Sequence, residues 1–337
     1  MNDTGPTPPP ISMSLESARR AVLDHVLALV TKAPSSDALV LRGSMAMLAW
    51  AGPAARTPGD LDWIVLDRLA VSIDEEHPYP YVRSVETVQQ WPEAAAGAAR
   101  YDLWRDENFD TGGAHPRVPP DGLKWVPNLA EYEPKDLYPE LVDLLREEPQ
   151  VAEGIRIDPE GVRQSPDWSY AYAGTGTPGL RVLVPWHADG YPPDDLHLDF
   201  AFDESLPDPP VWAAVPRGDG GPPTATRAAS RESALAWKLL WLYSDAHGYS
   251  NTYPQPKDLY DAVLLAESDQ TRLTPQLLLK VLRRSLSADE VEDFGLDSIL
   301  IGDDDWAGFQ EDYPQVRGTA DQWLARLRRA LRQSGHN

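Results

Sequence analysis

Residues 38–66 read ALVLRGSMAMLAWAGPAARTPGDLDWIVL, and this stretch predicts how the chain is organised. It divides into an apolar strand, a Gly-Ser turn that begins a helix, a loop, and a second strand that opens with Asp-Leu-Asp. Because side chains alternate along a strand, Asp60 and Asp62 are predicted to point to the same face, about 7 Å apart. Two carboxylates in this arrangement can converge on one divalent metal ion.

The Gly43-Ser44 turn supplies a second indication of function. It begins the predicted helix, whose free backbone N–H groups favour an anion such as a phosphate. A phosphate cradle beside a carboxylate pair is typical of enzymes that transfer a nucleotide or a phosphoryl group. Taken alone, a Gly-Ser pair is more often a simple helix start, and Asp-x-Asp is more often a solvated strand end, so the rest of the chain must decide.

Composition limits the class of protein and the chemistry. The chain has 337 residues of which 42% are hydrophobic, which predicts a globular protein with two domains. It has no cysteine, which excludes disulfides, thiolate metal sites and cysteine nucleophiles and leaves oxygen ligands and histidine. The seven histidines show no ligand spacing, and although paired strands would allow His187 and His197 to approach each other, a surface or stacking role is favoured for them.

The net charge of −23 comes from 30 basic and 53 acidic residues, and it argues against non-specific binding to DNA or to a membrane. RNA is not excluded as a substrate, because charge can be distributed unevenly. No stretch resembles a signal peptide or reaches membrane-spanning length, so we expect a cytoplasmic location.

The predicted domain organisation has four parts. Listed in chain order, these are a disordered Pro-rich tail at 1–12, an α/β domain at 13–204 with an insertion at about 102–135, a Pro/Gly-rich linker at 205–229, and a helical domain at 230–337. Helices are expected at 14–32, 44–51, 84–99, 136–147, 230–246, 256–268, 274–286, 287–294 and 319–333. Residues 154–203 read as an antiparallel hairpin followed by an edge strand.

That last strand contains a third acidic candidate. Asp199 lies in the run LHLDFAF, and Asp203 shares its face as an alternative. Asp199 lies in the middle of the strand, between two apolar residues, and is the preferred candidate. With Asp60 and Asp62 it completes an arrangement that holds two Mg²⁺ ions.

Further along the chain come two helical motifs: ESALAWKLLWL, which contains Lys238, and Lys257-Asp258-Leu259-Tyr260-Asp261. The ordered set of Gly43-Ser44, Arg56, Asp60-x-Asp62, Asp199 and these helices resembles the AbiEii/AbiGii nucleotidyltransferase toxin family. That family belongs to type IV toxin–antitoxin systems and to the DNA polymerase β-like nucleotidyltransferase superfamily. The resemblance covers about residues 38–268. One departure is Pro58, which stands where the family usually has Thr or Ser, with Thr57 before it.

The resemblance implies an α/β (α+β) nucleotidyltransferase fold, with a short mixed sheet flanked by helices and a C-terminal helical domain. It implies Mg²⁺-dependent transfer of a nucleoside monophosphate from an NTP to an acceptor hydroxyl. The residues to which it assigns metal binding are Asp60, Asp62 and Asp199, those for NTP binding are Gly43, Ser44, Arg56, Lys238 and Lys257, and the further catalytic candidates are Lys238 and Asp258. Asp258 can act as a general base, as an orienting group or as the partner of Lys238, whereas Asp261 is expected to be structural.

The acceptor stays open at this stage. The family suggests RNA, such as a tRNA acceptor end, and a cognate antitoxin, with no DNA or membrane partner. The last predicted helix carries Arg326, Arg328, Arg329 and Arg332, which form either a basic patch for RNA or a solvated helix end. The first alternative is a small cationic acceptor of the aminoglycoside type, which suits the acidic chain. The second is a non-catalytic nucleotide-binding regulatory module.

Overall fold

The computed structural model describes residues 13–66, 137–165, 179–202, 204, 206–248 and 253–333, together with the backbone of short strands at 69–72, 81–82, 115–116, 123–126, 170–172 and 175–177. The predicted tail at 1–12 and the predicted helix at 84–99 lie outside the described residues. So does the predicted insertion at 102–135, apart from the strands β5 (His115–Pro116) and β6 (Leu123–Val126).

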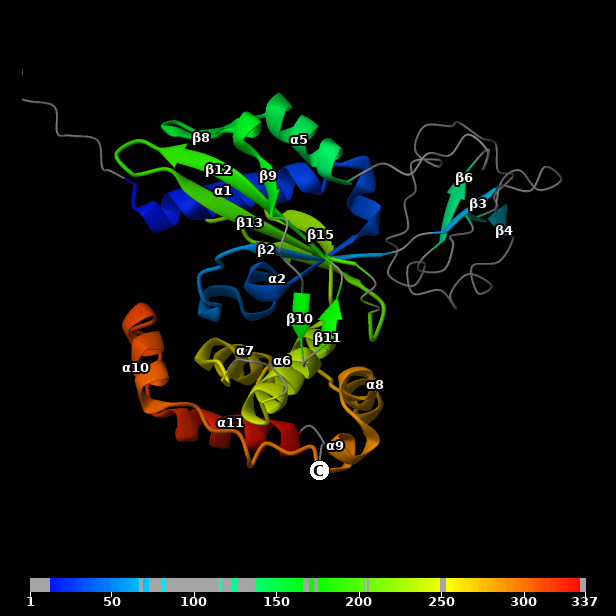
Figure 1. Cartoon of the computed structure of the whole chain (residues 1–337), viewed down its shortest axis with the longest axis vertical. Coiled ribbons are helices and arrows are strands. Elements are labelled where there is room, and N and C mark those ends of the chain that lie inside the picture. Colours follow the sequence, from blue (N-terminus) through cyan, green and yellow to red (C-terminus); the bar gives the residue numbers. More distant parts are fainter. Residues whose placement is uncertain are drawn as a thin grey trace, which may run out of the picture.

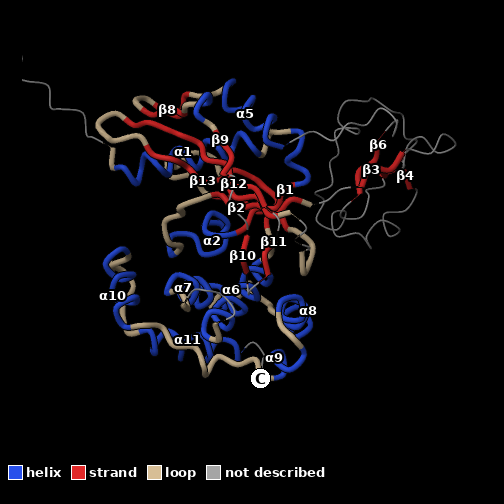
Figure 2. Tube along the Cα trace, viewed as in Figure 1, coloured by secondary structure: helices blue, strands red, loops and turns tan. Residues whose placement is uncertain are grey.

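A mixed sheet forms the centre of the molecule (Figure 2). In chain order its strands are β1 (Leu39–Arg42), β2 (Leu61–Val65), β7 (Gln150–Ala152), β8 (Ile155–Ile157), β9 (Arg163–Ser165), β12 (Gly179–Ala188), β13 (Asp194–Ala201), β14 (Val211–Val215) and β15 (Thr224–Ala228). They pair in the order β14-β15-β1-β2-β13-β12-β8-β7, and β9 also pairs with β12. β1 is parallel to β15 and β2 is parallel to β13, whereas the other pairs are antiparallel.

The helices fall into an N-terminal group and a C-terminal group along the chain, and the C-terminal group gathers on one side of this sheet (Figure 1). The N-terminal group is α1 (Leu15–Val30), α2 (Gly43–Ala51) and α5 (Leu137–Glu147). The C-terminal group is α6 (Arg231–Ala246), α7 (Pro256–Ala266), α8 (Pro275–Ser285), α9 (Ala288–Glu292), α10 (Asp303–Asp312) and α11 (Ala320–Gln333). Short strand pairs outside the main sheet are β3 (Leu69–Ser72) with β6, β4 (Tyr81–Val82) with β5, and β10 (Tyr170–Tyr172) with β11 (Thr175–Thr177).

Side-chain alternation assigns the two faces of the sheet to two different cores. Leu41 and Trp63 belong to a buried cluster that includes the apolar side of α1. Val40 and Ile64, one position along each strand, belong to a second cluster with α6 and α7. The face that carries Val40 and Ile64 therefore looks toward the C-terminal helices.

Local signals in the sequence explain where several helices begin. The Ser14 hydroxyl caps α1 by accepting from the Ser17 backbone N–H at 3.1 Å, and the Ser230 hydroxyl caps α6 by accepting from the Ser233 N–H at 2.9 Å. Thr274 caps α8 in the same way, and Pro275 occupies its first turn. These caps agree with the predicted helix starts. Within the described residues, no helix is both long enough and apolar enough to cross a membrane.

Two predictions about this architecture are wrong, and one helix was not predicted. The stretch 205–229 is not a plain linker, because it contains β14 and β15, which extend the main sheet beside β1. β13 is not an edge strand, because it lies between β2 and β12. Helix α10 was not predicted, because its Asp-rich sequence shows little apolar periodicity. The division of the chain into an N-terminal and a helical domain stays a prediction.

The turn between β14 and β15 is anchored to α1 through a buried carboxylate. Asp24 is 2% exposed, and it accepts from the Gly218 backbone N–H at 2.7 Å and from Arg20 Nε at 3.0 Å. A buried carboxylate with two donors fixes the hairpin to α1, which distinguishes this segment from a flexible linker.

We expect Asp24→Ala to lower the free energy of unfolding by about 1–3 kcal/mol, because it removes the buried acceptor that the Gly218 N–H and the Arg20 guanidinium share. Urea denaturation at unchanged m-value measures this loss. The matched control is Asp219→Ala in the same turn, where the carboxylate pairs with Arg217 in solvent and contributes about 1 kcal/mol or less. Equal losses in the two variants would contradict the anchoring role of Asp24.

Candidate active site

Three carboxylates gather at the centre of the sheet. β2 and β13 run parallel, and their register places Asp62 directly beside Asp199. Asp60 precedes β2 by one residue and shares the face of Asp62. One ligand oxygen from each of the three lies within 4.8 Å of the others. The predicted triad is therefore assembled in space, on the sheet face that looks toward the C-terminal helices.

This donor set fits a hard divalent cation. Carboxylate oxygens are the ligands that Mg²⁺, Mn²⁺ and Ca²⁺ prefer, and three like charges at this separation repel one another without a counter-charge. Asp199 is 3% exposed, while Asp60 and Asp62 are half-buried and accessible from one side. The alternative third ligand, Asp203, lies outside the described residues.

Two arginines complete a row of charges that runs across four strands. The registers place Arg42 opposite Asp62, Asp62 beside Asp199, and Asp199 opposite Arg181. Arg181 donates from Nε and Nη2 to the two Asp199 oxygens at 2.7 and 2.6 Å. Arg42 is buried, and its Nη1 donates to both carboxylate oxygens of Glu204 at 2.7 Å. The order of charges along the row is therefore positive, negative, negative, positive.

Arg181 is a site residue that the sequence analysis missed. A signal for it exists in the hairpin β12–β13, because Arg181 and Asp199 are equally distant from the turn residue Gly190. In a hairpin, residues at equal distances before and after the turn are predicted to be cross-strand partners. Its bidentate contact is the strong class of charge-assisted hydrogen bond and orients the Asp199 carboxylate.

The Gly-Ser turn lies against the carboxylate pair. Gly43 has φ +70°, and a Cβ added there would lie 2.1 Å from Asp62 Oδ2. The Ser44 hydroxyl donates to Asp60 Oδ1 at 3.2 Å. Helix α2 begins here without a side-chain cap, so its first N–H groups point out beside the two carboxylates. This geometry supports the expected anion cradle, although the Ser44 hydroxyl contacts Asp60.

The remaining predicted residues form a second, buried cluster. Lys238 Nζ donates to Asp258 Oδ1 at 2.6 Å and lies 3.1 Å from Asp261 Oδ2, and Arg56 Nε donates to the same Asp261 oxygen at 3.1 Å. We call these four residues, Arg56, Lys238, Asp258 and Asp261, the buried quartet. Lys257 is exposed on α7 and lies apart from it.

Electrostatics keep both cations of the buried quartet charged. Burial alone would lower the pKa of Lys238, but attraction to Asp258 and Asp261 raises it above its ordinary value. Burial likewise opposes the charge of Arg56, and attraction to Asp261 and Asp258 raises its pKa. Of the roles considered for Asp258, the contact with Lys238 fits the ion-pair partner. Asp261, expected to be structural, contacts both cations.

A short loop connects the two groups of residues. Arg56 and Asp60 are four residues apart, so their Cα atoms are separated by no more than about 14 Å. The Tyr260 hydroxyl, next to Asp261 on α7, also donates to the Ala54 carbonyl at 2.6 Å. The C-terminal helices therefore hold the beginning of the segment that leads into the carboxylate pair.

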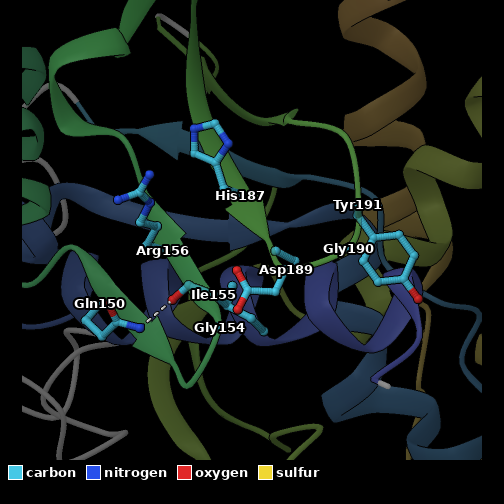
Figure 3. A pocket seen from close by; sticks show the side chains of 9 residues that line it. Gln150, Gly154, Ile155, Arg156, His187, Asp189, Gly190 and Tyr191 are labelled. Carbon is cyan, nitrogen blue, oxygen red and sulfur yellow. Dashed lines mark hydrogen bonds between the residues drawn. The ribbon is translucent and has the colours of Figure 1, made fainter. Parts of the chain in front are cut away.

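A cavity of about 470 Å³ lies at the other end of β12 from Arg181 (Figure 3). Arg156 and His187, which are cross-strand partners, lie on neighbouring strands beside it. None of the predicted site residues lines this cavity. The register also shows that paired strands do not bring His187 and His197 together, because His197 pairs with Leu183.

The arginines of α11 have mixed surroundings. Arg326 forms an ion pair with Glu267 at 2.7 Å, and Arg328 with Asp297 at 3.2 Å. Arg329 and Arg332 are exposed. Half of the predicted basic patch is thus paired with carboxylates, which reduces its net charge.

Gly43→Ala is expected to displace the Asp62 carboxylate, because the new methyl group overlaps it. The control is Gly52→Ala, at the other end of α2, where φ is also positive at +55° but nothing lies within 4 Å of an added Cβ. Both variants incur backbone strain of about 1–2 kcal/mol. Only Gly43→Ala is expected to weaken Mn²⁺ binding by calorimetry, by about 10-fold or more. Equal Mn²⁺ affinities would refute the contact.

Asp261→Asn is expected to destabilise the protein by about 3–5 kcal/mol, because it leaves two buried cations with one carboxylate. Chemical denaturation measures the change. Lys257→Ala, on the exposed side of the same helix, is the control and is expected to stay within about 0.5 kcal/mol of the parent protein. A small effect of Asp261→Asn would show that solvent reaches the buried quartet.

Comparison with known proteins agrees with this geometry. A family model described as nucleotidyl transferase AbiEii toxin, type IV TA system, matches residues 136–329, which is more than half of the chain. The matched region contains Asp199, Arg181 and the α6–α7 part of the buried quartet, whereas Gly43, Asp60 and Asp62 precede it. No curated protein matches the chain. The resemblance expected from the sequence motifs is confirmed, and the chain belongs to the AbiEii family of nucleotidyl transferase toxins of type IV toxin–antitoxin systems.

Proposed function

We propose that this protein is a Mg²⁺-dependent nucleotidyltransferase that moves a nucleoside monophosphate from an NTP to an acceptor hydroxyl. The observation that carries this proposal is the triad of Asp60, Asp62 and Asp199 beside the N-terminus of α2, with ligand oxygens within 4.8 Å. Family membership supports nucleotidyl transfer in a toxin–antitoxin setting.

The three carboxylates would hold the metal, with two Mg²⁺ ions as the expected number. When bound, the metal supplies positive charge that favours the attacking oxyanion and the leaving pyrophosphate. The acceptor oxygen forms a bond to the α-phosphorus while the bond from that phosphorus to its bridging oxygen breaks. The hydroxyl proton is lost to solvent, and pyrophosphate leaves.

The chain's own residues bind and orient the NTP. The backbone N–H groups at Gly43 and Ser44 donate to terminal phosphate oxygens, as helix N-termini do for anions. Arg181 orients the Asp199 carboxylate through its two hydrogen bonds.

Lys238 is the cation on the helical side of the site. Asp258 is a positioning residue for it, because its carboxylate accepts from the Lys238 ammonium at 2.6 Å. Arg56 contributes in the same way through Asp261. Lys257, exposed on α7, is the candidate for an outer phosphate contact.

RNA, such as a tRNA acceptor end, is the acceptor class that we propose, with a cognate antitoxin as regulator. A small cationic acceptor is the second candidate, because a net charge of −23 attracts cations and repels polyanions. A non-catalytic nucleotide-binding module is a weaker alternative, because all three metal-ligand candidates are present and assembled.

Asp60→Ala and Asp62→Ala are each expected to reduce nucleotide transfer by about 100-fold or more, because each removes a metal ligand. The fold is expected to survive, because each substitution also relieves repulsion among the carboxylates. The assay incubates the protein with Mg²⁺ and each labelled NTP, with tRNA and aminoglycosides supplied as separate acceptor pools. Asp195→Ala is the control, because this half-exposed β13 carboxylate pairs with Arg163 outside the triad.

The acceptor pool that becomes labelled decides between the two acceptor classes. No labelling of RNA, protein or small acceptors by the parent protein would contradict the enzymatic proposal. Failure to bind Mg²⁺-NTP by calorimetry in a folded protein would exclude the regulatory module as well.

A further inference from the structure

The segment that delivers Asp60 to the triad contains a flexible point. Gly59 immediately precedes Asp60, its φ lies outside the left-handed region, and an added Cβ there would have nothing within 4 Å. Neither backbone conformation nor space therefore requires glycine. Since glycine has more backbone freedom than any other residue, the position of Asp60 depends on whatever holds the Gly59 peptide.

A single guanidinium on α1 contacts this peptide. Arg19 Nη2 donates to the Gly59 carbonyl oxygen at 2.9 Å, and Arg19 Nη1 donates to Asp194 Oδ2 at 2.5 Å. The Gly59 carbonyl belongs to the peptide plane that ends at the Asp60 Cα, and Asp194 is the first residue of the strand that carries Asp199. Arg19 thus bridges the two chain segments that supply Asp60 and Asp199.

A second contact from α1 restrains the same segment. The Thr57 hydroxyl donates to Glu16 Oε1 at 2.6 Å, and Glu16 lies three residues before Arg19 on one side of the helix. Pro58, between the two contacts, is buried and has a fixed φ. Thr57, directly before Pro58, supplies the hydroxyl contact of this segment.

The Arg19–Asp194 ion pair is partly exposed, with side-chain exposures of 29% and 41%, so it contributes little to global stability. Its value is in geometry, because a metal site requires its ligands to be held within about 0.5 Å. Because the Arg19 contact adds little to stability but lies next to the metal ligand Asp60, its loss is expected to change the metal affinity more than the free energy of unfolding.

We propose that Arg19 is a positioning residue for the metal site, holding the Gly59–Asp60 peptide at a fixed place relative to β13. This inference rests on the proposed function, because it takes Asp60 and Asp199 as metal ligands. It assigns to α1, whose other side packs in the core, a direct part in setting the distance between two of the carboxylates.

The test compares Arg19→Ala with Arg20→Ala in the full chain, with Mn²⁺ alone as the probe in calorimetry. Arg20 is the matched control, because it also leaves α1 to make an ion pair and a backbone contact, but with Asp24 and the Pro216 carbonyl. Arg19→Ala is expected to bind Mn²⁺ about 10–100-fold more weakly, with a small change in Tm. Arg20→Ala is expected to keep the parent Mn²⁺ affinity.

A rescue variant separates positioning from a general effect of lost charge. Gly59→Ala in the Arg19→Ala background restricts the segment without a steric clash, so it is expected to recover part of the Mn²⁺ affinity. Arg19→Lys, which presents one point charge instead of a fork, is expected to bind with intermediate affinity. No recovery in the double variant would overturn the positioning role.

The outcomes distinguish this inference from the proposed function. A parent protein that binds Mn²⁺, together with an Arg19→Ala variant that binds it equally well, keeps the proposed function and overturns the inference. A folded parent protein that does not bind Mn²⁺ overturns both.

Discussion

Repulsion among three carboxylates is the constraint on which the centre of this structure depends. Asp60, Asp62 and Asp199 bring their oxygens within 4.8 Å in a partly buried place, where like charges are costly. Parallel pairing of β2 with β13 imposes the closeness, and the flanking strands supply the compensation. Arg181 neutralises Asp199 from β12, while Ser44 donates to Asp60 from α2. The register of four strands is thereby coupled to the charge balance of one site.

The buried quartet is a second case of compensation, built differently. The triad concentrates one sign of charge, whereas the quartet pairs two cations with two anions in the interior. Lys238 is 5% exposed and Asp261 is fully buried. Such a network favours one arrangement of the C-terminal helices, because a shift of α7 against α6 would separate Asp258 from Lys238.

Much of this could be predicted from the sequence, and the failures have physical causes. Helical periodicity and capping residues located α1, α6, α7, α8 and α11, and strand alternation placed Asp60 and Asp62 on one face. The resemblance confirmed by the family match directed attention to Asp199 and Lys238. Pairing between distant strands was not accessible, since alternation fixes a face and not a neighbour. The central place of β13 beside β2 and the addition of the strands at 211–228 beside β1 depend on such pairing, whereas Arg181 lies within a hairpin and could have been found by counting from its turn. The buried quartet was predicted only in part, because Asp258 was considered as a partner of Lys238 but the contacts of Asp261 with Lys238 and Arg56 were not.

The register between distant strands also determines when during synthesis the site can form. Asp62 pairs with Asp199 and Leu41 pairs with Ala228, so these partners are 137 and 187 residues apart in the sequence. Long-range pairings of this kind form late, and chains emerge from the ribosome N-terminus first. A nascent chain that has not yet passed Asp199 carries two of the three carboxylates, and one that has not passed residue 228 lacks the strand beside β1. For a member of a toxin family, this topology means that an unfinished chain carries no complete site, whatever the antitoxin does later.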